Sequence, residues 1–266
     1  MSDKDYWERH ASKYDASVKW TLGKPLSRIS DLCAEAVRGK QRVLEVAAGT
    51  GIVTSVIAKT CDSVVATDYA EAMVEVLARR IRDEGLDNVQ SEQADIYALP
   101  YPDGEFDAVV AANVLHLVPD FPAAIDALRR VTKPGGKLVA PTFCHDQTRI
   151  SWLASRLFAV TGFPSNRRFT LQSLRKALED SGMRVNRAEV LPGLLPIGFV
   201  EGIFPADAAN VVLCGKPSFP NSRSSMPASS FPVFTGNAVN GGRTFAQRES
   251  PLDIASSLFC AGIGPY

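Results

Sequence analysis

The sequence predicts an α/β fold with a doubly wound, mostly parallel, seven-stranded sheet and helices on both of its faces. Short apolar segments of strand length alternate with amphipathic segments of helix length as far as Cys214. Parallel neighbours in a sheet need crossover helices, so this alternation is typical of a parallel sheet that is covered on both faces. A glycine-rich turn also separates the first strand from its crossover helix, which is typical of doubly wound folds that bind a ligand at the sheet edge.

The expected strands are short runs bounded by turn residues or by helical segments. The first comes directly before the glycine-rich turn, and the fifth follows the turn Pro134-Gly135-Gly136. In chain order, the strands are expected at 43–47, 63–67, 88–93, 106–111, 137–143, 183–190 and 210–214.

Amphipathic periodicity predicts the helices around these strands. The first expected helix runs from Lys24 to Val37, and Gly39 follows it as a C-terminal stop. The apolar segment 191–204 is too apolar for an exposed loop and too rich in Gly and Pro for a helix, so we interpret it as a lid or pocket wall. The other helices are expected at 52–60, 71–84, 121–131, 147–160 and 171–181.

The bulk composition favours one main domain with a small-molecule partner. The chain has 266 residues, 45% of them hydrophobic and 22% charged, which is enough to bury one substantial core. Lys+Arg and Asp+Glu number 29 each, so the net charge gives no attraction to nucleic acid or to anionic membranes. A basic stripe with interleaved aromatic residues is also missing from the sequence, which disfavours a nucleic-acid partner.

The cysteines and the start of the chain bear on its compartment. The five cysteines lie far apart without a CxxC pair, which argues against a disulfide scaffold and a structural zinc site, so no metal is expected. The charged start MSDKDYWERH lacks the apolar core of a signal peptide, and no segment approaches the roughly twenty apolar residues of a membrane-spanning helix. We therefore expect a cytoplasmic protein without integral membrane association.

The motif VLEVAAGTG, from Val43 to Gly51, is the most informative feature of the chain. An apolar strand runs into a glycine turn, and an acid, Asp68, ends the next strand, as in sites for adenosine-type ligands. A dinucleotide site would have a third glycine or an alanine where this chain has Thr54. That difference weakens an NAD-dependent oxidoreductase as the interpretation.

The order of polar residues along the chain adds specificity. Glu45 lies inside the first strand, Asp68 ends the second, Asp95 ends the third and Asn113 follows the fourth. With VLEVAAGTG, and with QADIYALPYPDGEFDAVV at 93–110, these residues resemble the class I S-adenosylmethionine-dependent methyltransferases, in the broad group that contains quinone and phospholipid methyltransferases.

The resemblance runs from about Tyr6 to Lys216. It implies a Rossmann-like fold, S-adenosyl-L-methionine as the cofactor and S-adenosyl-L-homocysteine as its product. In the glycine turn, small residues would let the backbone approach the cofactor, since bulkier side chains would exclude it. The cofactor-binding residues that the resemblance implies are Tyr14, Glu45, Ala47, Gly49, Gly51, Asp68, Tyr69, Met73, Asp95, Ile96 and Asn113.

Two of these acids have a structural alternative. Asp68 would accept hydrogen bonds from both ribose hydroxyls, but it could also be a helix cap before Ala70. Asp95 would accept from the adenine amine, with Ile96 beside the ring, but it could also be a turn residue. Tyr69 and the nearby methionine would pack against ribose and adenine.

Methyl transfer needs a base when the acceptor is an amine, phenol or enol. His116 follows the fourth strand and His145 ends the fifth, so both are expected at the ligand edge of the sheet, and either could be that base. A hydrogen-bonded pocket or cap histidine is an equally good interpretation of His116. His10, with Tyr6, Trp7 and Tyr14, resembles the amino-terminal segment that closes over the cofactor in many relatives, although these aromatic residues could instead attach the first helix to the body.

The acceptor is expected to be small and partly hydrophobic, because many apolar side chains are predicted above the same sheet edge. Arg167 and Arg168 could clamp a carboxylate or phosphate on it, or simply form a solvated turn. The expected pocket residues are Trp152, Phe158, Phe163, Phe169 and the segment 191–204.

We therefore expect three regions: a helical cap at 1–40, a methyltransferase domain with acceptor-pocket insertions at 41–216, and a Ser/Pro/Gly-rich tail at 217–266. The expected reaction is methyl transfer to an O, N or C nucleophile. A cofactor-binding protein that transfers no methyl group, as a partner protein or a catalyst of another reaction, is the alternative. The acceptor and the oligomeric state stay open.

Overall fold

The computed structural model describes residues 7–8, 11, 14–149, 151–152, 166–193 and 195–206, without the side chains of 14–24. The predicted strand at 210–214, the tail at 217–266 and the candidate residues Tyr6, His10, Phe158 and Phe163 lie outside the described residues.

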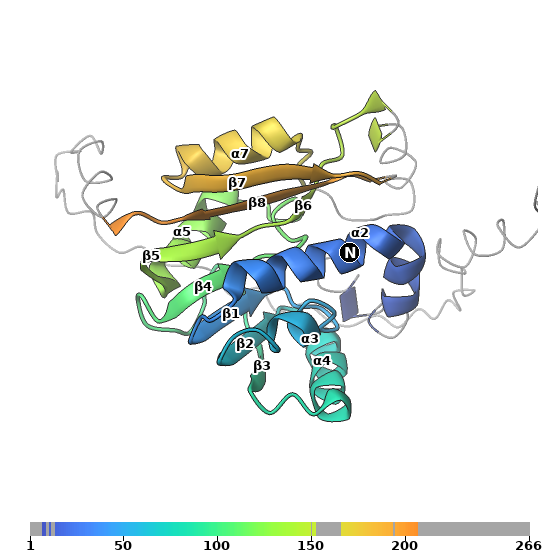
Figure 1. Cartoon of the computed structure of the whole chain (residues 1–266), viewed down its shortest axis with the longest axis vertical. Coiled ribbons are helices and arrows are strands. Elements are labelled where there is room, and N and C mark those ends of the chain that lie inside the picture. The colour runs from blue at the N-terminus through green and yellow to red at the C-terminus, as the bar shows by residue number, and fades with distance from the viewer. Residues whose placement is uncertain are drawn as a thin grey trace, which may run out of the picture. The chain divides into compact units, whose positions relative to one another are not determined.

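One mixed sheet forms the centre of the described chain (Figure 1). Its strand order is β3-β2-β1-β4-β5-β8-β6, and β7 pairs with β8. Strands β1 to β5 run parallel to one another, whereas β8 is antiparallel to β5, β6 and β7. The strands are β1 Arg42–Val46, β2 Ser63–Asp68, β3 Val89–Gln93, β4 Phe106–Val110, β5 Thr132–Val139, β6 Thr142–Phe143, β7 Arg184–Leu191 and β8 Ile197–Ile203.

Strands β5 and β6 both pair with β8 and together form one interrupted strand. Val139 pairs with Glu201 and Thr142 pairs with Gly198, so both parts keep the same register. Pro141 lies between them and has no N–H to donate to the ladder, which explains the break. The sheet therefore has the mostly parallel, doubly wound form that the sequence predicts.

The interpretation of 191–204 as a lid or pocket wall was wrong. Seven of these residues, Ile197–Ile203, form β8, which lies between β5 and β7. Their Gly content reflects close packing: a Cβ on Gly198 would come within 2.7 Å of the Sγ of Cys144, and one on Gly202 within 2.6 Å of the Cε of Met183. Glycine in a strand often marks such a close approach.

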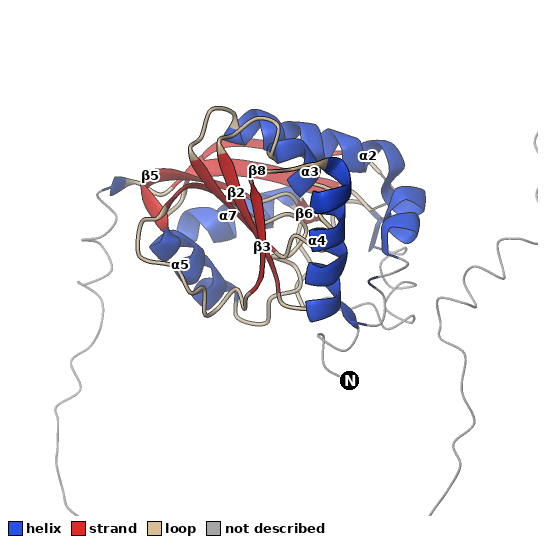
Figure 2. Ribbon diagram, turned by 90° about the horizontal axis from the view of Figure 1, so that it is seen from below, coloured by secondary structure: helices blue, strands red, loops and turns tan. Residues whose placement is uncertain are grey.

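Helices cover both faces of the sheet, and each face has its own apolar core (Figure 2). Successive strand residues alternate between the cores, so that Val43 faces one and Leu44 faces the other. One core includes residues of α2 Tyr14–Val37, α3 Thr54–Ile57 and α4 Glu71–Glu84, and the other includes residues of α5 Phe121–Val131 and α7 Leu171–Asp180.

The predicted helices at 71–84 and 121–131 are confirmed with these bounds. The first helix begins at Tyr14 instead of Lys24 and continues through Pro25. The predicted turn before the fifth strand is instead part of β5: a register shift follows the pairing of Phe106 with Thr132, and Gly135 there has a φ of 76°.

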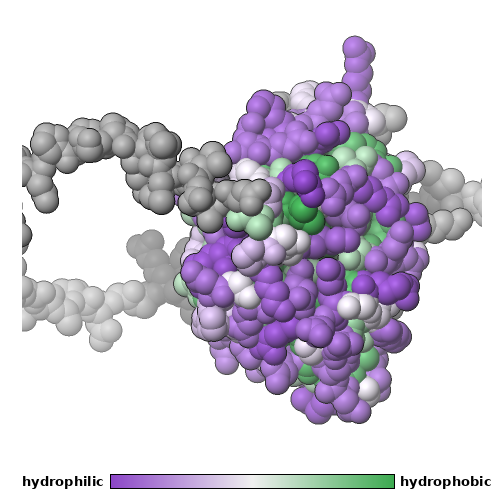
Figure 3. All heavy atoms as spheres, turned by 60° about the vertical axis from the view of Figure 1, so that its left-hand side comes forward, coloured by the Kyte–Doolittle hydropathy of each residue, from purple (hydrophilic) through white to green (hydrophobic). Residues whose placement is uncertain are grey.

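The face in Figure 3 is mainly hydrophilic, with small hydrophobic areas between polar side chains. Among the helices that the structure describes, none is long and apolar enough to cross a membrane.

Candidate functional site

The strand order reverses at β1, which pairs with β2 on one side and with β4 on the other. Chain connections leave the sheet in opposite directions at such a point, and ligands bind in the crevice outside the carboxyl ends of the strands there. The glycine turn follows β1, Asp68 ends β2, and Asn113 and His116 follow β4. The structure thus places four of the predicted elements of the site at one edge.

The glycine turn has a left-handed backbone at three residues. The φ angles are 52° at Ala47, 58° at Gly49 and 86° at Gly51. Gly51 is also required by packing, because a Cβ there would come within 2.5 Å of the Cδ1 of Leu77 on α4. The turn therefore lies against α4, a constraint that the motif alone did not indicate.

Asp68 joins this turn to the start of α4. Its Oδ2 accepts from the backbone N–H of Gly49 at 2.8 Å, and its Oδ1 accepts from that of Ala70 at 2.9 Å. Burial raises the pKa of Asp68, while the hydrogen bonds from Ala70, Gly49 and Tyr69 oppose that rise. The helix-cap role considered for Asp68 is present. It leaves room for a ligand, because each carboxylate oxygen can accept more than one hydrogen bond.

Glu45 lies beneath the turn and is 1% exposed. Its Oε2 accepts a 2.6 Å hydrogen bond from the Oγ1 of Thr54, and burial raises its pKa to about 8. Thr54 thus has a function that the sequence interpretation missed, since it was read only as a missing glycine. The signal was available: a carboxylate inside an apolar strand needs a hydrogen-bond partner nearby.

The residues after Asp68 divide between surface and core. Tyr69 is 51% exposed, and Met73 is 2% exposed and packs with Ala11 and Ala70. Tyr14 begins α2, but its side chain lies outside the described part of the chain. Whether these residues contact a cofactor stays a prediction.

The third strand leads into a tight turn at Asp95. The Oδ1 of Asp95 accepts from the backbone N–H of Tyr97 at 3.0 Å, so the turn role considered for this acid is present. Ile96 packs against the core beneath α5 and α7. Across the edge, Asn113 has a left-handed φ of 53°. Its Oδ1 is buried and has no hydrogen-bond partner among the described residues.

His116 and His145 are brought together at the edge. Their ring centroids are 5.5 Å apart, and Phe143 packs edge-on against His116 at 5.2 Å. Burial lowers the pKa of His116 to about 3, with His145 as a second cause. Burial, and then the charge of Arg168, lowers the pKa of His145 to about 4. Both rings are therefore neutral near pH 7.

A neutral imidazole has one N–H donor and one acceptor nitrogen. His145 is 4% exposed, and neither of its nitrogens has a hydrogen-bond partner among the described residues. The backbone carbonyl of His116 accepts from the N–H groups of Asn166 and Arg167, each at 3.0 Å. His145 can therefore offer hydrogen bonds to a ligand without carrying charge.

Most of the described residues that were expected in the acceptor pocket have other contacts. Phe169 is 6% exposed, and its ring packs against Phe121 of α5. It is therefore a core residue. The Nε of Arg168 lies 3.4 Å from the Oδ1 of Asp146, and the guanidinium of Arg167 lies over the ring of Phe121. These contacts disfavour both arginines as an anion clamp. Trp152 is 43% exposed.

Comparisons with known proteins agree with this geometry. Residues 44–140 match the model of the methyltransferase domain family. The ubiquinone/menaquinone biosynthesis C-methyltransferase of Teredinibacter turnerae is 37% identical over 132 residues, which are 48% of this chain and 53% of that protein. The chain thus spans about half the length of the curated relatives it matches.

Solved structures share the fold. A SAM-dependent methyltransferase from Aquifex aeolicus has a TM-score of 0.58 at 22% identity, covering 77% of this chain and all (100%) of that one. The [4+2]-cyclase SpnF has a TM-score of 0.57 at 21% identity, covering 67% of this chain and 80% of that one. Residues 44–140 thus match a methyltransferase domain, the sequence is similar to that of a quinone C-methyltransferase, and the fold is that of a SAM-dependent methyltransferase.

Proposed function

We propose that the protein transfers the methyl group of S-adenosyl-L-methionine to an O, N or C nucleophile of a small, partly hydrophobic acceptor. The observation that carries the proposal is the 2.8 Å hydrogen bond from Gly49 to Asp68, which sets a buried carboxylate against the left-handed turn after β1. A carboxylate beside an uncrowded backbone suits a ribose diol.

The residues present fit the cofactor. The turn leaves the half-buried backbone at Ala47 and Gly49 with little side chain, and Asp68 retains acceptor capacity for ribose hydroxyls. The Oδ1 of Asn113 is buried without a hydrogen-bond partner among the described residues, so it is a second polar group in need of a ligand or water at this edge. Glu45 would act indirectly in this arrangement, by holding Thr54 beneath the turn.

When bound, the cofactor would supply an already activated sulfonium methyl, so the protein has mainly to align the nucleophile with it and exclude water. His145 would hold the acceptor oxygen or nitrogen through a ring nitrogen, neither of which has a partner within the described part of the chain, and would receive its proton. With a pKa of about 4, His145 is a weak base, so it is better suited to take the proton of an acidic phenol or enol. An ammonium acceptor would have to lose a proton before it could act as the nucleophile.

For the acceptor we propose a hydroxylated aromatic or quinone-type ring. The Teredinibacter turnerae relative is named for C-methylation in ubiquinone and menaquinone biosynthesis. The neutral His145 beside Phe143 and His116 agrees with such a ring, since His145 offers hydrogen bonds and the neighbouring rings offer aromatic contact without a fixed charge.

The test is incubation of the full chain with methyl-labelled cofactor and a panel of hydroxyquinones, phenols and lipid extracts, followed by mass spectrometry of the labelled product. We expect the label in a ring-hydroxylated compound. His145→Gln is expected to lower turnover by about a hundredfold or more with unchanged affinity for S-adenosyl-L-homocysteine. A label found only in phospholipid headgroups would contradict the proposed acceptor.

A second function is supported by SpnF, a cyclase that shares this fold. The protein could bind the cofactor and catalyse another reaction or serve a partner protein. Tight binding of S-adenosyl-L-homocysteine without any label transfer would favour this alternative. In calorimetric titrations, binding of NAD without binding of S-adenosyl-L-homocysteine would instead favour an oxidoreductase.

A further inference from the structure

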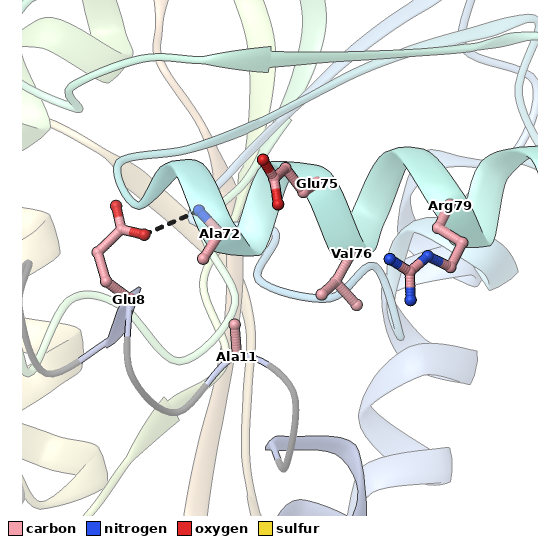
Figure 4. A pocket seen from close by; sticks show the side chains of 6 residues that line it. All are labelled: Glu8, Ala11, Ala72, Glu75, Val76 and Arg79. Atoms are coloured by element: carbon pink, nitrogen blue, oxygen red, sulfur yellow. Dashed lines mark hydrogen bonds between the residues drawn. The ribbon is translucent and has the colours of Figure 1, made fainter.

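The start of α4 is capped by a residue from far away in the sequence. The N-cap position is Ala70, whose side chain makes no capping hydrogen bond. Glu8 supplies the cap: its Oε1 accepts from the backbone N–H of Glu71 at 2.8 Å, and its Oε2 accepts from that of Ala72 at 2.9 Å. Figure 4 shows the Glu8 side chain reaching the first turn of α4, with the bond to Ala72 drawn.

This contact is strong for two reasons. The first N–H groups of a helix have no partner within the helix, so a carboxylate that accepts from two of them satisfies two exposed donors. The helix N-terminus also carries partial positive charge, which favours an anionic side chain. Since the cap comes from residue 8 and not from the helix itself, it also fixes the amino-terminal segment against α4.

The same segment contacts residues next to the candidate cofactor site. Ala11 is 5% exposed and forms a small apolar cluster with Ala70 and Met73, against which Trp7 also packs. The N–H of Ala70 donates to Asp68. Three successive backbone N–H groups at the start of α4 are therefore held by two carboxylates, the first by Asp68 and the next two by Glu8.

Beyond this first turn the packing is open. A cavity of about 320 Å³ lies between the segment and α4, lined by Glu8, Ala11, Ala72, Glu75, Val76 and Arg79 (Figure 4). The two hydrogen bonds of Glu8 and the apolar cluster around Ala11 and Met73 are therefore the described contacts that attach this segment to α4.

We propose that Glu8 is a positioning residue for cofactor binding: its carboxylate attaches Trp7, Glu8 and Ala11 to the first turn of α4, a contact called the latch below, and so holds Asp68 and Met73 in place. The inference rests on the proposed function, because it assigns Asp68 to the cofactor. Binding and latching must then favour each other, since a coupling between two sites is reciprocal.

The first arm of the test measures the latch without the cofactor. In the full chain, Glu8→Gln replaces one acceptor oxygen by an NH₂ group that faces a backbone N–H. Amide hydrogen exchange at Glu71 and Ala72 should become faster by on the order of tenfold. Glu75→Gln is the matched control, since it makes the same charge change beside the same cavity, and it should leave both amides unchanged.

The second arm adds S-adenosyl-L-homocysteine. It should slow exchange at the two amides in the wild type, and Glu8→Gln should weaken its affinity by about threefold to tenfold, the size expected for one lost cap. Glu8→Asp, which keeps the charge, should recover part of the loss. Unchanged exchange in Glu8→Gln would overturn the latch, and faster exchange with unchanged affinity would overturn its positioning role. A wild type that does not bind the probe would reject the proposed function, while the first arm still decides on the latch.

Discussion

The Oγ1 of Thr54 donates a 2.6 Å hydrogen bond to the Oε2 of Glu45, and both residues are buried. The threonine stands where a dinucleotide-binding turn has glycine or alanine. Here a side chain at that position satisfies a carboxyl group inside β1 that would otherwise be buried without a partner. Thr54, which departs from the dinucleotide pattern, and Glu45, the acid inside β1, therefore form one hydrogen-bonded pair.

This pair gives a pH dependence of stability. The folded-state pKa of Glu45 is raised from 4.5 to about 8, so the folded protein keeps a proton that the unfolded chain loses. Its contribution is complete below about pH 4.5 and is lost as the pH rises toward 8, at up to about 1.4 kcal/mol per pH unit. Glu45→Gln, which mimics the protonated acid, should flatten this loss in urea unfolding measured from pH 5 to 8.5.

A second variant for that experiment is Thr54→Val. It removes the hydroxyl but keeps the shape, and it should cost about 1–3 kcal/mol because the carboxyl group loses its partner. If Glu45→Gln and the wild type lose stability in parallel between pH 5 and 8.5, Glu45 is not the group that titrates.

Gly51→Ala should destabilise the fold through contact with α4. The new Cβ would come within 2.5 Å of the Cδ1 of Leu77, at a residue whose φ of 86° already disfavours a side chain. We expect a loss of roughly 2–4 kcal/mol in the free energy of unfolding. Gly39→Ala is the control, because its φ of 71° is similar but its Cβ would meet nothing within 4 Å. It should cost only the backbone strain, about 1–2 kcal/mol.

The two causes can be separated by a double mutant. Leu77→Ala alone opens a cavity, but combined with Gly51→Ala it should recover part of the contact cost, so that the two effects are not additive. Strict additivity in thermal or urea unfolding would mean that the turn does not lie against Leu77.

Asp68→Ala should weaken the binding of S-adenosyl-L-homocysteine by about 1.5–3 kcal/mol, because charged hydrogen bonds to the ribose would be lost. The variant also removes the partners of Gly49 and Ala70, so binding is compared by calorimetry well below its melting temperature. Asp103→Ala is the control: its carboxylate pairs with Arg130 on an exposed surface. An affinity of Asp68→Ala equal to that of the control would remove Asp68 from the site.

The alternation of strands and helices was predictable because it depends on local periodicity. The helices at 71–84 and 121–131 have one apolar face each, and the glycine turn has a conformation that few residues adopt. Positions at the carboxyl ends of parallel strands follow from topology alone, which is why Asp68, Asn113 and the two histidines were placed at one edge.

What the sequence did not disclose depends on contacts between distant segments. The cap from Glu8, the packing of Gly51 on Leu77 and the pairing of Thr54 with Glu45 leave no periodic pattern. The same holds for Phe169: an aromatic residue near a predicted pocket is equally compatible with a core position, and only the arrangement of α5 and α7 decides between them.

Strand β8 is the clearest case, because its Gly and Pro content led to the interpretation of 191–204 as a lid or pocket wall. Gly202 pairs with Val185 of β7 and with Leu138 of β5, so it has a neighbouring strand on both sides. A Cβ there would press on the backbone carbonyl of Arg184 and lie 2.6 Å from the Cε of Met183. The side chain of Met183 can move, whereas the carbonyl is fixed by the pairing of β7 with β8.

Gly202→Ala should therefore cost roughly 2–4 kcal/mol in urea unfolding, and adding Met183→Ala should not restore it, because the backbone contact remains. Gly193→Ala is the control: its nearest neighbours would lie 3.5 Å away, an ordinary contact, so its stability should stay within about 0.5 kcal/mol of the wild type. If Met183→Ala rescued Gly202→Ala fully, the obstacle would be the methionine side chain, and the glycine would then be a packing preference. If the rescue fails, the glycine is a requirement of β8 as an internal strand.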